Sequence, residues 1–301
     1  MPQYLAGVLI ELINPVVHAW SNILDGYFSN KVFQKLSSLI FFGSFVNILF
    51  LPLVLLVGMP SMISMGLTLI LIPIALIEVC FQYPYYWSLR STDPSIVSSL
   101  FSLGKVFVPI LAFFIVGERL TVFQYVGFGI IVISSVLLTF DRKKFRLNRA
   151  FYLMLCVSFI LCLQGVLYKY AFNMGMTWST AVFWGAGFEF IIAGAFVFLI
   201  RNNRVDFGSS IKKVHDAGAL IVFNQFLSWT GNVADPLAIS LIPVSVSKSI
   251  TSLQPLFVLL YTTIFKKRKP HLFKEYPDDA GTSKKIVLIL LIIVGTVFVV
   301  V

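Results

Sequence analysis

Two charged side chains stand inside long apolar stretches of this 301-residue chain. Lys105 lies in the middle of the run that begins at Pro94, and Glu78 lies in the run before it. A charge at the bilayer centre costs roughly 2.5–3.5 kcal/mol on insertion scales, so such a side chain must face protein or water. Together the two could hold a zwitterion, because Lys105 can bind a carboxylate or phosphate and Glu78 can bind an amine.

Other polar residues recur at steps of three and four, the spacing that places side chains on one helix face. Glu11, His18 and Asn22 share such a face, and Gln82 follows Glu78 by one turn. These faces predict the wall of a shared, hydrated interior. The expected substrate-binding residues are Lys105, Glu78, His18, Asn22, Gln82, Tyr86, Trp87, Ser102, Lys169, Trp229 and Lys248.

Some of these groups could move protons or close a path. Glu11, His18 and Glu78 are candidate proton carriers, since ionisable residues inside membranes often form proton relays. Asp235, Lys169 and Lys248 are candidates for a gate near one end of the spans. Two alternatives stay open: Asp25 and Lys248 lie near span ends and could extend to water, and Glu189, in a Gly- and Ala-rich helix, could have only a packing role.

The composition is that of a membrane protein. Hydrophobic residues make up 58% and charged residues 12%, and the mean hydropathy is +0.92. The net charge of +10 lies in the loops, where membrane topology explains it without nucleic acid. The three cysteines, at 80, 156 and 162, form no metal-ligand cluster, and no hydrolase or phosphate-loop motif is present. We therefore expect no metal, no cofactor and no enzymatic activity.

Ten helical spans can be drawn, which predicts an all-α polytopic membrane protein. The first lacks a basic start and a cleavage site, so it is expected to be a retained helix rather than a signal peptide. The fifth and tenth are almost wholly apolar and should stand outside a cavity that the first, third, fourth, sixth, eighth and ninth surround. The spans are 4–25, 36–57, 66–89, 95–116, 122–140, 150–172, 177–200, 217–235, 241–265 and 285–301.

The chain contains an internal repeat. The segment Ser99–Val108 aligns with Ser249–Val258 at an offset of half the chain. Each half, 1–148 and 149–301, then holds five spans, and an odd number makes the two repeats inverted across the membrane. Inverted repeats with a site near the midplane are typical of secondary transporters.

The loop charges predict the orientation. Almost all loop lysines and arginines fall on odd-numbered loops, and Arg119 is the basic residue on the even ones. The positive-inside rule then makes the odd loops cytoplasmic and places both termini outside, in a bacterial inner membrane.

The hinge after the fourth span reads Gly-Glu-Arg-Leu at 117–120, and Gln124, Gly127 and Gly129 follow it in the next span. This pattern resembles the end of the five-helix repeat of the drug/metabolite transporter superfamily, in its EamA-type branch. The resemblance implies a small-solute carrier that works by alternating access. Three features differ from that family: Lys105 stands where the repeat usually has a proline, the second hinge is Lys-Arg-Lys at 267–269, and the loop 58–65 is uncharged although the family usually has basic residues there and both termini inside. We favour an inverted orientation. The matching residues are Gly117, Glu118, Arg119, Leu120, Gln124, Gly127 and Gly129.

The sequence thus predicts a secondary active transporter, proton-coupled or facilitative, for a small polar or zwitterionic metabolite such as an amino acid or amine. Its expected partners are that solute and the lipid bilayer, with no nucleic acid, as a monomer or homodimer. The alternatives are an organophosphate or nucleotide-sugar exchanger, favoured by the buried lysines, and, less favoured, a lipid flippase or scramblase.

Overall fold

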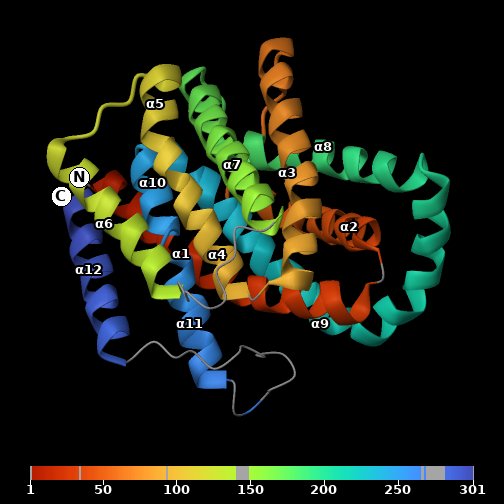
Figure 1. Ribbon diagram of the computed structural model, residues 1–301. Helices are drawn as coiled ribbons and strands as arrows, with labels where there is room; N and C mark the ends of the chain where they lie inside the picture. Colours follow the sequence, from red (N-terminus) through yellow and green to blue (C-terminus); the bar gives the residue numbers. More distant parts are fainter. Residues whose placement is uncertain are drawn as a thin grey trace.

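The computed structural model describes residues 2–33, 35–92, 94–139, 149–265, 268 and 282–300, which are mostly helical and contain no strand (Figure 1). Six helices are long and apolar enough to cross a membrane, and shorter apolar helices accompany them. The predicted all-α membrane protein is confirmed. The elements are α1 Pro2–Tyr27 with a π-helical end η1 Phe28–Val32, α2 Leu36–Leu55, α3 Met65–Ser91, α4 Pro94–Gly104, η2 Lys105–Phe107, α5 Val108–Val116, α6 Val122–Thr139, α7 Arg149–Asn173, α8 Trp178–Phe198, α9 Arg201–Leu241, α10 Val244–Thr251, α11 Gln254–Phe265 and α12 Thr282–Val300.

Local chemistry accounts for several helix ends. The hydroxyls of Ser64 and Thr177 accept N–H groups in the first turns of α3 and α8, as N-cap residues do. Gly117 ends α5 in the left-handed conformation, with φ of 70°. A side chain is strained in that conformation, which explains the glycine at the start of the hinge.

Two predicted continuous spans are each interrupted in the middle by a distorted turn, although the first, Ile96–Val116, still counts among the six helices of membrane-spanning length. The span predicted at 95–116 divides into α4 and α5 around the 3-10 turn η2, and the span predicted at 241–265 divides into α10 and α11. Pro109 and Pro255 follow the breaks, and a proline cannot donate the backbone hydrogen bond that would continue the preceding helix. Lys105 therefore stands at a helix break rather than in the middle of a helix.

The eighth span was predicted to begin at residue 217, but α9 begins at Arg201. Residues 201–216 are polar, so hydropathy ended the predicted span there. They contain no proline and no turn dipeptide, and the helix continues because polarity alone does not terminate a helix.

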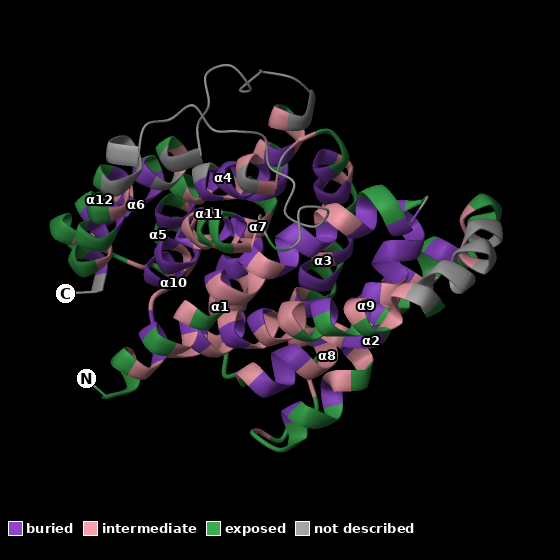
Figure 2. Cartoon of the chain, turned by 90° about the horizontal axis from the view of Figure 1, so that it is seen from below, coloured by how far each residue is buried: buried purple, intermediate pink, exposed green. Residues whose placement is uncertain are grey.

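Helix packing follows the same pattern in the two halves of the chain. α1 packs on α9 as α7 packs on α3, and α2 packs on α8. α6 and α12 pack on each other at one edge of the molecule (Figures 1 and 2). If the two halves of the chain are exchanged, the pair α1–α9 becomes the pair α7–α3, and the pairs α2–α8 and α6–α12 each remain the same pair. This symmetry is expected of two related five-helix units. The division at residues 148 and 149 remains a prediction.

The edge pair α6–α12 approaches closely. A Cβ atom added at Gly127 would lie 2.6 Å from the Gly295 carbonyl oxygen, so the glycines allow backbone contact of the kind found between membrane helices. The outer face of α12 exposes apolar side chains such as Leu290 and Ile293, which suits contact with lipid.

The predicted orientation remains a prediction, and eight of the basic loop residues on which it depends, at 142, 143, 144, 146, 266, 267, 269 and 274, lie outside the described residues.

Candidate functional site

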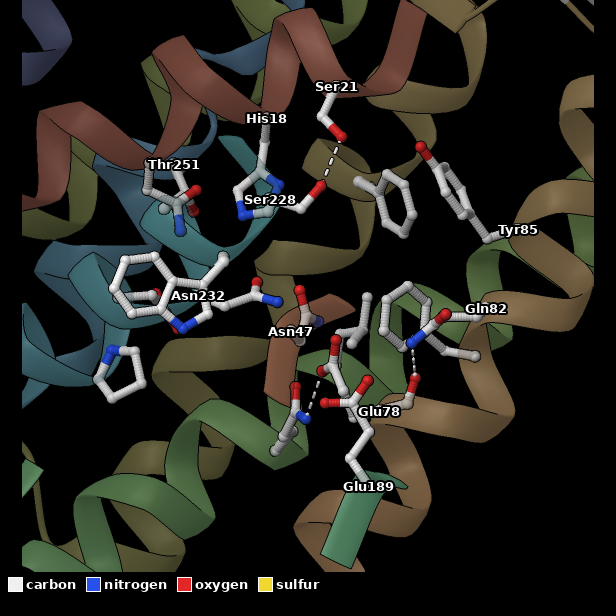
Figure 3. Close-up of a pocket in the computed structure, with 18 of the residues that line it drawn as sticks. His18, Ser21, Asn47, Glu78, Gln82, Tyr85, Glu189, Ser228, Asn232 and Thr251 are labelled. Atoms are coloured by element: carbon white, nitrogen blue, oxygen red, sulfur yellow. Dashed lines mark hydrogen bonds between the residues drawn. The ribbon is translucent and has the colours of Figure 1, made fainter. Parts of the chain in front are cut away.

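A cavity of about 260 Å³ lies among the helices (Figure 3). Its wall comes from α1, α3, α7 and α9 and from the broken segments α4–η2 and α10–α11. Among the described residues, α6 and α12 contribute nothing to it, as predicted for the fifth and tenth spans. The prediction left out α2 and α8, which also line the cavity through residues such as Asn47 and Glu189.

One side of the cavity is acidic. The carboxylate of Glu78 on α3 accepts a hydrogen bond of 2.9 Å from the Gln164 side-chain amide, and that of Glu189 on α8 accepts one of 3.0 Å from the Ser44 hydroxyl. Figure 3 shows Glu78 and Glu189 on the same side of the cavity. Within the described part of the chain, neither carboxylate forms a salt bridge, so both remain able to bind a cation.

The other side carries the cations. The Lys105 ammonium at η2 donates a hydrogen bond of 2.7 Å to the Thr251 hydroxyl. The Lys248 ammonium binds both oxygens of Asp235, at 2.5 and 2.7 Å. The described residues therefore leave Lys105 without a carboxylate partner. Thr251 lies across the cavity from Glu78 and Glu189 in Figure 3.

Glu11 lies next to this basic group but outside the lining. It is 0% exposed, and neither of its carboxylate oxygens has a hydrogen-bond partner in the described structure. Asp235, Lys248 and Lys105 are the charged groups that act on it. His18, two turns further along the same face of α1, lines the cavity. Its ring lies against Gly231, and a side chain at position 231 would clash with the ring.

Aromatic rings form much of the remaining wall. The indole Nε1 of Trp229 is buried and has no partner among the described residues, so it can donate to a bound solute. Rings offer apolar surface and also attract cations. The aromatic lining residues are Phe81, Tyr85, Tyr86, Phe101, Tyr168 and Trp229.

Most of the residues predicted to bind substrate do line the cavity: Lys105, Glu78, His18, Asn22, Gln82, Tyr86, Trp229 and Lys248, together with the gate candidate Asp235. Trp87, Ser102 and Lys169 do not. Trp87 packs against an apolar cluster, and Ser102 donates to the Ser98 and Ser252 carbonyls.

Lys169 has a different place from the other gate candidates. Its ammonium donates to the carbonyl oxygens of Ile239 and Ile242, at 2.8 and 2.9 Å. It thus supplies hydrogen bonds to free backbone carbonyl groups at the end of α9. Asp235 and Lys248 pair with each other without it.

The sequence reasoning missed several lining residues, among them Asn47, Gln164, Tyr168 and Glu189. Asn47 had no signal, because it belongs to no repeating polar face. Glu189 was noticed and left open as a packing residue. Asp25 could have reached water from its helix end, but it is only 6% exposed and lines the cavity.

No three His, Cys, Asp or Glu side chains converge on a possible metal position in the ranges that the structure describes. What those residues provide is a pocket with polar and charged groups of both signs and aromatic walls. Such an arrangement suits reversible binding of a small polar solute.

Comparisons with known proteins agree with this geometry. The sequence model of the EamA-like transporter family matches residues 9–140. A solved crystal structure with 12% sequence identity covers 97% of this chain, and 96% of its own chain is covered, with a TM-score of 0.63; at that identity the likeness concerns the fold. No curated protein sequence matches.

The members of that family are transporters. The family match and the apolar helices together make this chain an integral membrane protein. Over residues 9–140, the chain is similar to the EamA-like transporter family.

Proposed function

We propose that this protein is a secondary transporter that carries a small zwitterion across a bacterial inner membrane. Like an amino acid, the solute would have one carboxylate and one ammonium group. One observation carries the proposal: the cavity wall presents a lysine without a carboxylate partner, Lys105, and, across from it, two carboxylates without a cationic partner, Glu78 and Glu189. A zwitterion would place its carboxylate at Lys105 and its ammonium group at the glutamates.

The size and surface of the cavity support a small substrate. Its volume of about 260 Å³ lies below the roughly 300–1,000 Å³ of sites for drug-sized ligands. Rings such as Tyr86 and Trp229 would cover the apolar part of the solute, and the Trp229 N–H would add a hydrogen bond.

The charge arrangement weighs against organophosphate or nucleotide-sugar exchange. A phosphate monoester brings about two negative charges and needs several cations. Lys169 lies outside the cavity wall, and Asp235 neutralises Lys248, so Lys105 would remain alone among the three lysines within the spans.

Alternating access is the transport mode that the helix breaks support. The breaks at η2 and between α10 and α11 occupy corresponding positions in the two halves, and both border the cavity through Lys105 and Thr251. Interrupted helices at matched positions are the usual setting of substrate sites in transporters built from inverted repeats.

The rest of the proposal follows the sequence-based predictions. Both termini lie outside and the odd loops are cytoplasmic. The protein works as a monomer or homodimer in the bilayer with no further partner. A proton gradient is the expected energy source, with Glu11, His18 and Glu78 as candidate carriers.

The test is binding of an amino acid panel to the purified protein by calorimetry. Each zwitterion is compared with its methyl ester, which lacks the carboxylate, and its N-acetyl derivative, which lacks the ammonium group. A hydrogen bond to a charged group contributes about 1.5–3 kcal/mol, so a zwitterion should bind at least about tenfold more tightly than either derivative.

Two variants then assign the ends of the solute. Lys105→Ala should remove the preference over the ester, and Glu78→Gln should reduce the preference over the N-acetyl form. Lys31→Ala, at an exposed lysine on η1, is the matched control and should bind as the wild type does. If neither cavity variant changes these preferences, the zwitterion proposal is wrong; binding of phosphate esters, or lipid scrambling in liposomes, would favour the alternatives.

A further inference from the structure

A second polar cluster lies in the cavity wall around Asp25 of α1. Its carboxylate accepts a hydrogen bond of 2.9 Å from the Tyr85 hydroxyl on α3 and one of 2.8 Å from the Asn224 side-chain amide on α9. The Tyr85 hydroxyl also lies 3.3 Å from the Asn22 side-chain oxygen. This cluster therefore joins two helices of the first half of the chain to one of the second.

Within the part of the chain that the structure describes, the groups that face Asp25 are neutral. Tyr85 and Tyr86 face it from α3 and Asn224 from α9, while α1 itself adds Ser21 and Asn22. Ser21 in turn shares a hydrogen bond of 2.6 Å with Ser228 of α9.

The nearby cations are engaged elsewhere. Arg90 of α3 donates to the carbonyls of Ser29 and Phe33, Lys105 donates to Thr251, and Lys248 pairs with Asp235. A buried carboxylate without a cation is costly in a membrane protein. The hydrogen-bond donors around Asp25 offset part of this cost, and a bound proton or cation would remove the rest.

The neighbours of Asp25 favour a proton over a metal ion as that source. Each carboxylate oxygen already faces a hydrogen-bond donor, and such donors would repel a metal ion. An acceptor for a carboxylic acid proton is also present, because the Asn224 carbonyl oxygen is buried and has no partner within the described residues. Rotation of the Asn224 amide would let that oxygen accept the new O–H.

We infer that Asp25, in place of the sequence-based candidates Glu11, His18 and Glu78, is the proton-binding site that couples the relative position of the two halves to a proton gradient. A proton from cavity water forms an O–H bond on the carboxylate, and the same bond breaks when the proton returns to water on the other side. Loading changes the hydrogen bond to Asn224, which is one of the contacts between α1 and α9. The inference rests on the proposed transport function for its direction, but the proton site itself does not.

Infrared difference spectroscopy of the wild-type protein, between alkaline and acidic buffer, tests the site without any substrate. A band from a protonated carboxylic acid should appear and should be lost in Asp25→Asn. Asp235→Asn is the matched control, since Asp235 is an aspartate of the same cavity paired with Lys248, and it should keep the band. An unchanged band in Asp25→Asn, or its loss in Glu11→Gln or Glu78→Gln instead, overturns the assignment.

Proteoliposomes test the coupling. Asp25→Asn should retain exchange of labelled for unlabelled solute but lose accumulation driven by a pH gradient, so that the inside-to-outside ratio falls to about one at equilibrium. Accumulation at the wild-type level in this variant would refute the coupling role.

If Asp25→Asn does not fold, a second variant tests the same site. Tyr85→Phe keeps the carboxyl group and removes one donor to it, so the carboxylic acid band must shift in frequency, and an unshifted band would count against the site. Failure of the zwitterion assay would leave the infrared result intact, so the two proposals can fail separately.

Discussion

The pair of Asp235 and Lys248 offers a quantitative test of the cavity. The ammonium lies 2.5 and 2.7 Å from the two carboxylate oxygens, and the side chains are 16% and 13% exposed. Removing one partner of a fully buried pair costs about 3–5 kcal/mol, whereas a surface pair contributes about 0–1 kcal/mol. Because this pair borders a wet cavity, we expect Asp235→Asn or Lys248→Met alone to cost about 2–3 kcal/mol.

The double variant should cost much less than the sum of the two single variants, because it leaves no charge unpaired. Unfolding of the purified proteins, followed by circular dichroism as a denaturing detergent is added, gives the four free energies of the cycle. We expect a coupling energy of about 1.5–3 kcal/mol.

The control is the same cycle with Lys31→Met in place of Lys248→Met. Lys31 lies on η1, outside the cavity wall, so its effect should add to that of Asp235→Asn within about 0.5 kcal/mol. If the Asp235 and Lys248 variants are equally additive, the ion pair does not stabilise the fold and the reasoning about charges in this cavity is refuted.

Three further predictions use the same unfolding assay. Glu118→Ala should cost about 0.5–2 kcal/mol, because its carboxylate accepts the first two N–H groups of α10 at 2.9 and 3.0 Å; an unchanged stability would mean that water replaces this cap. Gly127→Ala should cost about 1–3 kcal/mol through its clash with α12, whereas Gly129→Ala, which meets open space, should be tolerated, and equal losses would contradict the close packing. Lys169→Met should destabilise the end of α9 while solute affinity stays within about twofold, and a larger loss of affinity would return this lysine to the binding site.

Much of the fold followed from hydropathy. Apolar runs of membrane-spanning length marked the helical segments, because a bilayer imposes a minimum length and excludes unsatisfied backbone groups. The hinge at Gly117 and Glu118 pointed to the family that the comparison then matched over residues 9–140. The breaks beside Pro109 and Pro255 were not predicted, because hydropathy alone does not show whether the backbone hydrogen bonds of a helix are continuous.

The sequence by itself determined which faces of α1, α3 and α9 are polar, because spacing at three and four residues places side chains together on one helix. It could not determine which faces meet. Whether Lys248 pairs with Asp235, whether Lys169 turns to the end of α9 and whether Glu189 borders water depend on contacts between helices far apart in the chain. Only the tertiary packing decides these contacts, and with them which charges are neutralised and which remain free to bind a solute.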